Sequence, residues 1–296
     1  MKKYIYNLES PKKYSYISIN TTGLSYNNSE IFSIGILLGR ENKICLLIIE
    51  DLKEEEKLLK ETLEIIKGND FIAYNGDFVR NFLMAKISAY NLPVNFEIIS
   101  LLKRLRTFSY IFKSHSFAKS SMDEYFSLPK DELSGKELAK IIDDYLKLRD
   151  EKIFEKIKTY AYKSLLGLEN LHTKIENFLE SYLNFSLKDY RFYIDEILLI
   201  KNILTITGRS DYKNSYFSAN GLYTLSLGEN FKIQINSLNN LYDEKNYCYY
   251  VKKKDFKGLK NSEVIKSPKE ILIIYYKDYI IENILNLIKY ILDKEI

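Results

Sequence analysis

The stretch Tyr16-Ile17-Ser18-Ile19-Asn20-Thr21-Thr22-Gly23-Leu24 decides the fold of this chain of 296 residues. Its first part alternates apolar and polar side chains, which is the period of a half-buried β-strand. The strand then ends in Thr-Thr-Gly-Leu, a turn signal because glycine and hydroxyl side chains favour turns. The stretch therefore predicts a strand with Ser18 and Asn20 at its polar positions and two threonines at its end.

Strands and helices alternate on either side of this turn. A run with period two and two further apolar runs predict three opening strands, and a hairpin connection joins the second to the third. A helix with an apolar face follows and stops at Gly68-Asn69, and the turn Asn75-Gly76 separates a buried strand from a second helix. The predicted elements are strands over 14–20, 31–38 and 44–49, a helix over 52–67, a strand over 71–74 and a helix over about 78–90.

The pattern changes twice farther along the chain. Residues from 100 to about 183 are mainly helical in their apolar spacing, and Ser134-Gly135-Lys136-Glu137 has the spacing of a capping box. Short strands replace helices from about Lys188, so we expect a first domain over 10–187 and a smaller α+β region over 188–296. The clearest segments are helices over 119–125, 134–148 and 152–168, strands over 216–220, 222–227, 231–235, 247–252 and 271–276, and a last helix over 278–292.

Composition limits the classes of function. With 46% hydrophobic residues the chain can form a proper core, and it lacks both the roughly 18 consecutive apolar residues of a membrane helix and the apolar core of a signal peptide. We therefore expect a cytoplasmic protein that does not insert into a membrane. The net charge of +4 is too small to demand a polyanionic partner. Cys45 and Cys248 lie in separate predicted strands and are expected to be core residues, not disulfide or zinc ligands.

The opening stretch resembles the first motif of the DEDD-type 3′-to-5′ exonucleases of the ribonuclease H-like superfamily, in which an Asp and a Glu precede the two threonines. Those two positions hold Ser18 and Asn20 here. The order of three strands, a helix, a strand and a helix is also that of a ribonuclease H-like mixed sheet with its central strand first. The resemblance thus implies an α/β fold, a ribonuclease H-like mixed sheet flanked by helices.

Two later segments resemble the same family. Residues 74–83 are similar to its second motif, where Asn75 and Phe78 match and Val79 stands at the position of the family's aspartate. Residues 114–119, 131–137 and the helix to Gly167-Leu168 look like those of bacterial proteins regarded as predicted exonucleases. In these relatives a helix carries a His and, four residues later, an Asp. This chain has Tyr160 and Ser164 at those positions.

These replacements predict the loss of catalysis. Hydrolysis of a phosphodiester by two metal ions needs several anionic oxygen ligands that hold Mg²⁺ or Mn²⁺ roughly 3.5 to 4 Å apart. Ser18, Asn20, Val79 and Ser164 are all neutral, and Tyr160 is a poor general base because tyrosine has an unperturbed pKa of about 10. We expect no metal, no cofactor and no catalytic residue. His115 and His172 are isolated and are not expected to be ligands.

Seven residues are candidates for contact with a nucleic acid through the former cleft: Thr21, Thr22, Asn75, Lys103, Arg104, Arg106 and Lys119. The basic members, with Lys113 beside them, would contact phosphates, and Phe108, Tyr110 and Phe112 would stack on bases. A solvated basic face over a tyrosine-rich core explains the same pattern equally well. Asn75 has a second explanation as a turn former.

Three functions follow from the sequence. The first is a catalytically inactive relative of the exonucleases that binds single-stranded nucleic acid or a protein partner through the former active-site cleft. The second is an active nuclease that holds Mg²⁺ or Mn²⁺ at a relocated site built from Asp77, Glu30 or the Asp143-Asp144 pair. The third is a scaffold subunit without nucleic-acid contact. Salt-dependent binding to oligonucleotides separates the first from the third.

Overall fold

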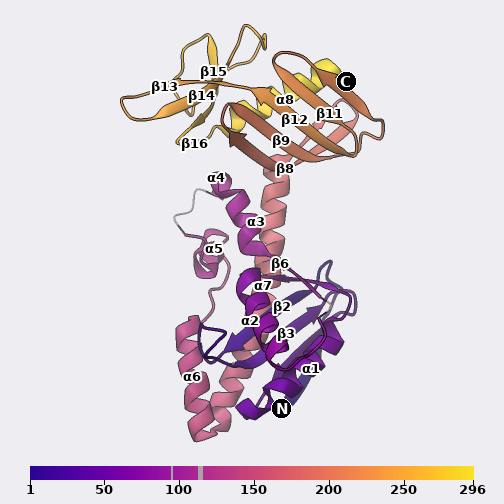
Figure 1. Ribbon diagram of the computed structural model, residues 1–296, viewed down its shortest axis with the longest axis vertical. Coiled ribbons are helices and arrows are strands. Elements are labelled where there is room, and N and C mark those ends of the chain that lie inside the picture. The colour runs from indigo at the N-terminus through magenta and orange to yellow at the C-terminus, as the bar shows by residue number, and fades with distance from the viewer. Residues whose placement is uncertain (95, 113–115) are drawn as a thin grey trace. The chain divides into compact units, whose positions relative to one another are not determined.

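The computed structural model describes residues 1–94, 96–112 and 116–296, so Lys113 and His115 lie outside the described residues. The chain divides into two compact units (Figure 1): the first contains residues 1–107 and 114–175, and the second contains residues 108–113 and 176–296. The division falls inside the long helix α7 (Glu151–Leu183). The boundary predicted at Lys188 marks the return of strands. The two compact units divide earlier in the chain, between residues 175 and 176 of α7.

The first unit is built on a six-stranded mixed sheet in the order β1-β4-β3-β2-β5-β6. Strand β2 lies next to β3 in antiparallel pairing, with Ser18 opposite Gly35, and next to β5 in parallel pairing. The predicted α/β class with a mixed sheet is confirmed, and the opening stretch occupies the interior of the sheet. The strands are β1 (Lys2–Asn7), β2 (Tyr16–Thr21), β3 (Ile31–Leu38), β4 (Lys43–Ile48), β5 (Asp70–Ala73) and β6 (Glu97–Ser100).

Strand β1 is absent from the three strands predicted to open the fold. It pairs with β4 at the edge of the sheet, and its residues alternate between half-buried and exposed. Its apolar positions are mostly tyrosines placed between lysines and asparagine, so the apolar signal is weak. Pairing with a buried neighbour, which a single-sequence pattern does not display, makes this segment a strand.

Helices follow the strands at the predicted places. The 3₁₀ helix η1 (Leu52–Glu54) and α1 (Glu55–Ile66) replace the single helix predicted over 52–67, and Ser134 and Glu137 form the predicted capping box of α6. Helix α7 continues past the clearest predicted segment, 152–168, to the predicted end of the helical stretch near residue 183, with buried apolar residues at Leu171, Ile175 and Leu179. The other helices here are α2 (Gly76–Ala89), α3 (Leu101–Thr107), α5 (Lys119–Tyr125) and α6 (Gly135–Leu148).

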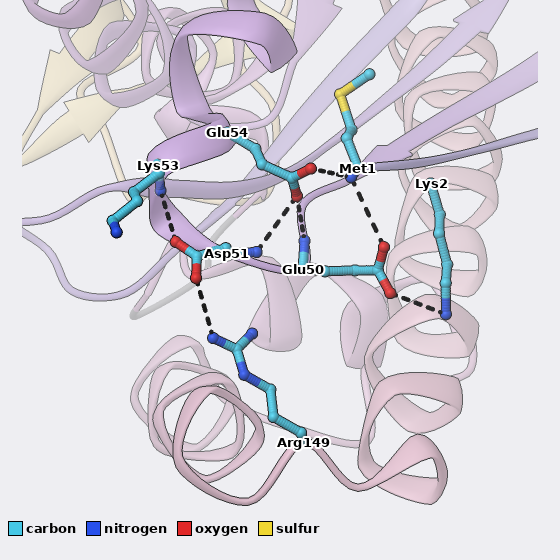
Figure 2. A network of polar contacts seen from close by, with 7 residues as sticks. All are labelled: Met1, Lys2, Glu50, Asp51, Lys53, Glu54 and Arg149. Carbon is cyan, nitrogen blue, oxygen red and sulfur yellow. Dashed lines mark hydrogen bonds and ion pairs between the residues drawn. The ribbon is translucent and has the colours of Figure 1, made fainter.

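A polar network fixes the start of η1 (Figure 2). The Asp51 side chain accepts a hydrogen bond from the Lys53 backbone at 3.0 Å, and the Glu54 carboxylate accepts one from the Glu50 backbone at 2.9 Å. Glu54 also pairs with the amino group of Met1, and Arg149 at the end of α6 reaches Asp51 at 3.3 Å. The network therefore ties β1, η1 and α6 together, in addition to the apolar core of this unit.

The core of the first unit is a continuous apolar cluster. It joins strands and helices through fully buried residues such as Ile17, Ile34, Leu59, Phe71 and Phe154. Cys45 is part of it and Cys248 lies in a smaller cluster of the second unit, which confirms both as core residues. Burial raises the pKa of both thiols.

The second unit contains two antiparallel sheets and helix α8 (Ile281–Glu295). The six-stranded sheet has the order β10-β11-β12-β9-β8-β7, and the four-stranded sheet has the order β13-β14-β15-β16. The α+β character expected from Lys188 onward agrees with these elements, although the long strands β8 and β9 are not among those predicted. The strands are β7 (Asn184–Leu187), β8 (Tyr190–Ile200), β9 (Ile203–Ser210), β10 (Tyr216–Ala219), β11 (Tyr223–Leu227), β12 (Asn230–Asn236), β13 (Leu238–Leu241), β14 (Tyr247–Lys252), β15 (Ile271–Tyr276) and β16 (Asp278–Tyr279).

Within residues 1–94, 96–112 and 116–296, none of the helices combines the length and the apolar character needed to cross a lipid bilayer.

Candidate functional site

Strand β2 carries the first two candidate positions. The Ser18 hydroxyl oxygen is buried and has no hydrogen-bond partner among the described residues. A Cβ atom placed on Gly35 would lie 3.0 Å from that oxygen and 3.5 Å from Leu165 of α7, so Ser18 lies close to α7. Asn20 donates a hydrogen bond to the Ser33 hydroxyl at 2.8 Å. Both positions thus hold neutral side chains inside the packed interior.

The turn after β2 uses both threonine hydroxyls internally. Thr21 donates to the carbonyl of Gly23 at 2.5 Å. The Thr22 hydroxyl accepts from the backbone of Glu30 at 3.0 Å and lies 3.1 Å from its carboxylate. These bonds close the loop between β2 and β3. A nucleic acid contacting either threonine would compete with the bonds that shape this turn.

Helix α2 begins at the second motif. Asn75 is its N-cap, and its side chain accepts a hydrogen bond from the Phe78 backbone at 3.3 Å. The turn-forming role of Asn75 is therefore present in the structure. The next residue, Gly76, has to be glycine, because a Cβ atom there would lie only 2.8 Å from Ser100. Val79 is 6% exposed and belongs to the apolar core, so its position offers no oxygen to a metal ion.

Helix α7 carries the last two candidate positions, Tyr160 and Ser164, one turn apart. The Tyr160 hydroxyl donates to the carbonyl of Leu133 at 3.4 Å, and Ser164 lies 3.5 Å from the Asp131 carboxylate. Burial, reinforced by the negative charge of Asp131, raises the pKa of Tyr160 to about 12. At neutral pH Tyr160 is therefore protonated and does not act as a general base.

Two carboxylates hold Lys119, one of the predicted phosphate contacts. The ammonium group lies 3.1 Å from Asp123 and 3.0 Å from Asp131. Asp123 is 1% exposed, and burial raises the pKa of its carboxyl group, against the influence of Lys119. Asp131 also approaches Ser164, so one carboxylate connects the lysine to the last candidate position. The positive charge of Lys119 is thereby compensated inside the protein.

A second predicted phosphate contact, Lys103, is also paired. Its ammonium group lies 2.9 Å from Asp77, which Arg80 approaches at 3.1 Å from the same helix. The hydrogen bond from Lys103 holds the pKa of Asp77 below its usual range. Arg104 is half-buried and Arg106 is exposed on the same short helix α3. The structure thus brings the second motif and the basic helix together, whereas no described contact joins Lys119 to Lys103.

The three aromatic residues predicted to stack on bases are buried. Phe108 and Phe112 are 0% exposed and Tyr110 is 6% exposed. Tyr110 packs against Tyr279 with ring centroids 4.9 Å apart, and Phe112 packs against Phe178 at 5.4 Å. The stacking prediction is wrong, because these rings form the core around the short helix α4 (Ser109–Phe112) in the second unit. Lys113 lies outside the described residues.

A cavity of about 330 Å³ opens beside Tyr160 and Asp131. Helix α7 contributes Tyr160, Leu166 and Gly167 to its wall, and the loop between α5 and α6 contributes Leu128 and Pro129. Charged side chains at the cavity are paired: Glu132 lies 2.7 Å from Lys163, and Lys130 lies 2.9 Å from Glu124. The cavity therefore offers apolar and aromatic walls with a compensated rim, a common composition for a binding pocket.

Gly167 keeps part of this cavity open. A Cβ there would meet the Lys119 ammonium at 3.5 Å and Asp131 at 4.0 Å, which are ordinary contact distances. These distances leave room for a Cβ atom, so packing does not require glycine at position 167. Glycine inside a helix costs roughly 0.5–1 kcal/mol relative to alanine. The sequence did not predict this cavity, because its walls come from two segments far apart in the chain, residues 128–132 and 160–170.

The side chains at the positions of the family's metal ligands do not fit a pair of divalent cations. The four positions that the resemblance assigns to metal ligands hold Ser18, Asn20, Val79 and Ser164, and none of them is anionic. The carboxylate that Ser164 approaches, Asp131, is paired with Lys119. Over the part of the chain that the structure describes, no group of three or more His, Cys, Asp or Glu side chains is arranged to hold a metal ion.

Three of the four acids proposed for a relocated site have partners within the protein. Asp77 pairs with Lys103, Glu30 contacts Thr22, and Asp143 pairs with Lys147 on α6.

His172 is 7% exposed and its Nδ1 lies 2.9 Å from the Tyr16 hydroxyl, as expected for a hydrogen-bonded core residue.

Comparison with known proteins places the first unit in a superfamily. A family model described as RNase_H superfamily matches residues 15–176, which is more than half of the chain and includes β2, α2 and the Tyr160–Ser164 turn of α7. A search of curated proteins found no match. With a mixed sheet centred on β2 and helices in the expected order, this chain belongs to the ribonuclease H superfamily.

Proposed function

We propose that this chain is a non-catalytic member of the ribonuclease H superfamily, derived from DEDD-type exonucleases, and that it acts by binding. The cavity lined by Tyr160, Leu166 and Gly167 of α7 serves as the binding site for an apolar segment of a protein partner. The observation that carries the proposal is the replacement of the anionic ligand set by Ser18, Asn20, Val79 and Ser164.

The surroundings of these residues support the loss of catalysis. Asn20 donates a hydrogen bond to Ser33, and Val79 is part of the apolar core. The carboxylate that approaches Ser164, Asp131, is already paired with the Lys119 ammonium group at 3.0 Å. A lysine in that place opposes the approach of a divalent cation. A general base is missing too, since the pKa of Tyr160 is raised to about 12.

The charges at the cavity favour a protein segment over a nucleic acid as its ligand. Lys119, Lys130 and Lys163 all have carboxylate partners at 3.1 Å or less. A phosphate at Lys119 would have to displace Asp131 or the buried Asp123. At the two exposed pairs it would meet the negative charges of Glu124 and Glu132, which repel it. An apolar side chain would enter between Leu128, Leu166 and Tyr160 without disturbing any ion pair.

Catalysis is tested with the full chain, single-stranded DNA and RNA, and Mg²⁺ or Mn²⁺. We expect no degradation and no paired binding of metal ions by calorimetry. Variants Asp77→Asn and Asp131→Asn serve as controls for contamination. Degradation by the wild type that disappears in either variant would show an active site and refute the proposal.

Binding at the cavity is tested by selecting peptides from a random library on the immobilised full chain. We expect the selected peptides to share an aromatic or aliphatic anchor and to lose binding to Gly167→Leu, whose side chain fills the cavity. Gly167→Ala is the matched control and should retain binding. If selected peptides bind Gly167→Leu unchanged, or if only oligonucleotides bind and Gly167→Leu abolishes that binding, the apolar-segment assignment is wrong.

A further inference from the structure

We propose that the second unit carries a separate binding surface for single-stranded nucleic acid. It consists of residues 252–269, from the last residue of β14 to the second residue before β15, called the basic segment below, and a hollow that this segment forms with α8. The inference goes beyond the proposed function, because it concerns other residues, another unit and another ligand.

The basic segment concentrates positive charge without compensation. It contains seven lysines against two acidic residues, Asp255 and Glu263, and Glu270 follows it directly. Within the described residues none of these lysines forms an ion pair, in contrast to Lys103 and Lys119 of the first unit. Six of the seven are exposed and Lys253 is half-buried. The seven are Lys252, Lys253, Lys254, Lys257, Lys260, Lys266 and Lys269.

The segment is nevertheless held in a defined conformation. Asn283 of α8 is 0% exposed, accepts a hydrogen bond from the Ser262 backbone at 2.8 Å and donates to the carbonyl of Ile273 at 2.7 Å. Phe256 is 1% exposed and packs against Tyr290 with ring centroids 5.8 Å apart. Tyr242 donates to the carbonyl of Lys266 at 2.8 Å. The lysines are therefore displayed on an anchored loop, which lowers the entropy cost of binding a ligand.

A hollow of about 420 Å³ lies where the segment meets α8. Its walls include Lys260 from the segment and Asn286, Lys289 and Tyr290 from α8. The one acidic residue in the wall, Asp293, lies 3.6 Å from Lys188, which reduces its repulsion of an anion. Lys289 also lies over the ring of Phe185 at 5.4 Å, which positions its ammonium group.

These groups match the chemistry of a single strand. Uncompensated lysines attract phosphates, and the energy comes from release of counterions. The half-buried ring of Tyr290 offers an aromatic surface to a base, and the Asn286 amide provides one donor group and one acceptor for a base edge. Bases in a duplex are stacked and paired, so only an unpaired base reaches such a hollow. The two sources of this chemistry, DNA and RNA, are distinguished by experiment.

The test measures the anisotropy of fluorescent 15-nucleotide oligo-dT and oligo-U with the full chain over a series of KCl concentrations. We expect salt-dependent binding. The double variant Lys260→Glu, Lys289→Glu should weaken it about tenfold or more at low salt and reduce the slope of log K against log salt by about 1.4, because single strands lose about 0.7 per phosphate contact. Asn286→Ala should weaken binding about fivefold at every salt concentration, as expected for a lost hydrogen bond.

The controls separate this surface from general charge and from the first unit. Lys232→Glu changes an exposed lysine on β12 and should leave the affinity within about twofold. Lys260→Gln with Lys289→Gln keeps the side-chain stems and should show a smaller loss in the same direction. Circular dichroism verifies that each variant is folded. Gly167→Leu should not affect oligonucleotide binding, whatever its effect on peptides.

Three results would overturn the proposal. The first is no salt-dependent binding by the wild type at low ionic strength. The second is an equal loss of affinity in Lys232→Glu and in the double variant, which would show that only net charge matters. The third is equal binding of polyglutamate of the same length, which would assign the surface to an acidic protein segment.

Discussion

The cavity beside α7 and the basic segment of the second unit use lysine in opposite ways. Lys119 and Lys163 lie 3.0 Å and 2.7 Å from carboxylates, so their charges are compensated within the protein. The lysines of the basic segment have no ion-pair partner among the described residues. The comparison teaches that a count of basic residues does not locate an electrostatic binding surface. The neighbours of each ammonium group decide whether its charge is available to a ligand.

The largest effect is expected at Lys119. Lys119→Met leaves Asp123, which is 1% exposed, and Asp131 without their cation. Breaking a buried pair on one side typically costs 3–5 kcal/mol, and the partial exposure of Lys119 puts the expectation at about 3 kcal/mol. Urea unfolding of wild type and variant measures this difference. A loss below about 1 kcal/mol would show that the cluster is solvated and that the two regions differ less than proposed.

The same variant has a defined pH dependence. Burial raises the pKa of Asp123 above its ordinary value of 3.8, so the folded state binds the proton more tightly than the unfolded state does. The contribution of this group is therefore favourable at low pH and is lost as pH rises through the folded pKa. Without Lys119 that pKa rises further. Lys119→Met should be less destabilised at pH 4.5 than at pH 7.5, and an equal loss at both would contradict the argument.

The next effect concerns the anchor of the basic segment. Asn283→Ala removes the partners of Ser262 and Ile273 and leaves a small cavity beside α8. We expect a loss of about 2 kcal/mol in the free energy of unfolding, since the Ser262 amide lies in a partly exposed loop that water reaches. Hydrogen exchange should show faster exchange in the basic segment, 252–269. Unchanged exchange there would mean that Asn283 does not hold the segment.

A smaller, opposite effect is expected at Gly167. Gly167→Ala should raise the free energy of unfolding by about 0.5–1 kcal/mol, because alanine is favoured inside a helix and its Cβ meets no atom closer than 3.5 Å. Thermal denaturation checks the sign. A destabilised variant would show that the cavity wall is tighter than described and that glycine is required for packing.

The smallest effect is expected at the cavity rim. Lys163→Ala breaks a pair with Glu132 in which both side chains are largely exposed, at 60% and 67%. Exposed pairs contribute little because water screens them, so the melting temperature should not change measurably. A clear decrease would mean that the rim is a structural element in its own right.

The sequence predicted the fold better than the candidate site. Apolar periodicity and caps place β3, α5 and the start of α6 correctly, because each has a strong local signal. Strands β1 and β8 needed pairing partners that a local pattern does not reveal. For the site, residue types identified Ser18, Asn20, Val79 and Ser164 as neutral, but not what surrounds them.

Partners far apart in the chain explain the remaining differences. Asp131 pairs with Lys119 twelve residues earlier, and Asp77 pairs with Lys103 from another helix. Phe108 and Phe112 lie beside basic residues in the sequence, yet they pack in the core. Lys252, Lys253 and Lys254 belong to the basic segment, although a lysine run at the end of a strand is usually a solvated turn. Only the structure shows which of these charges is compensated.

One measurement tests the division between the two regions most directly. Labelled single-stranded DNA and RNA are incubated with the full chain in Mg²⁺ or Mn²⁺, and binding and degradation are followed in the same samples. We predict salt-dependent binding without degradation, lost in Lys260→Glu, Lys289→Glu and retained in Lys103→Glu. Degradation that Asp77→Asn or Asp131→Asn abolishes, or binding that depends on Lys103 and not on Lys260 and Lys289, would contradict the account.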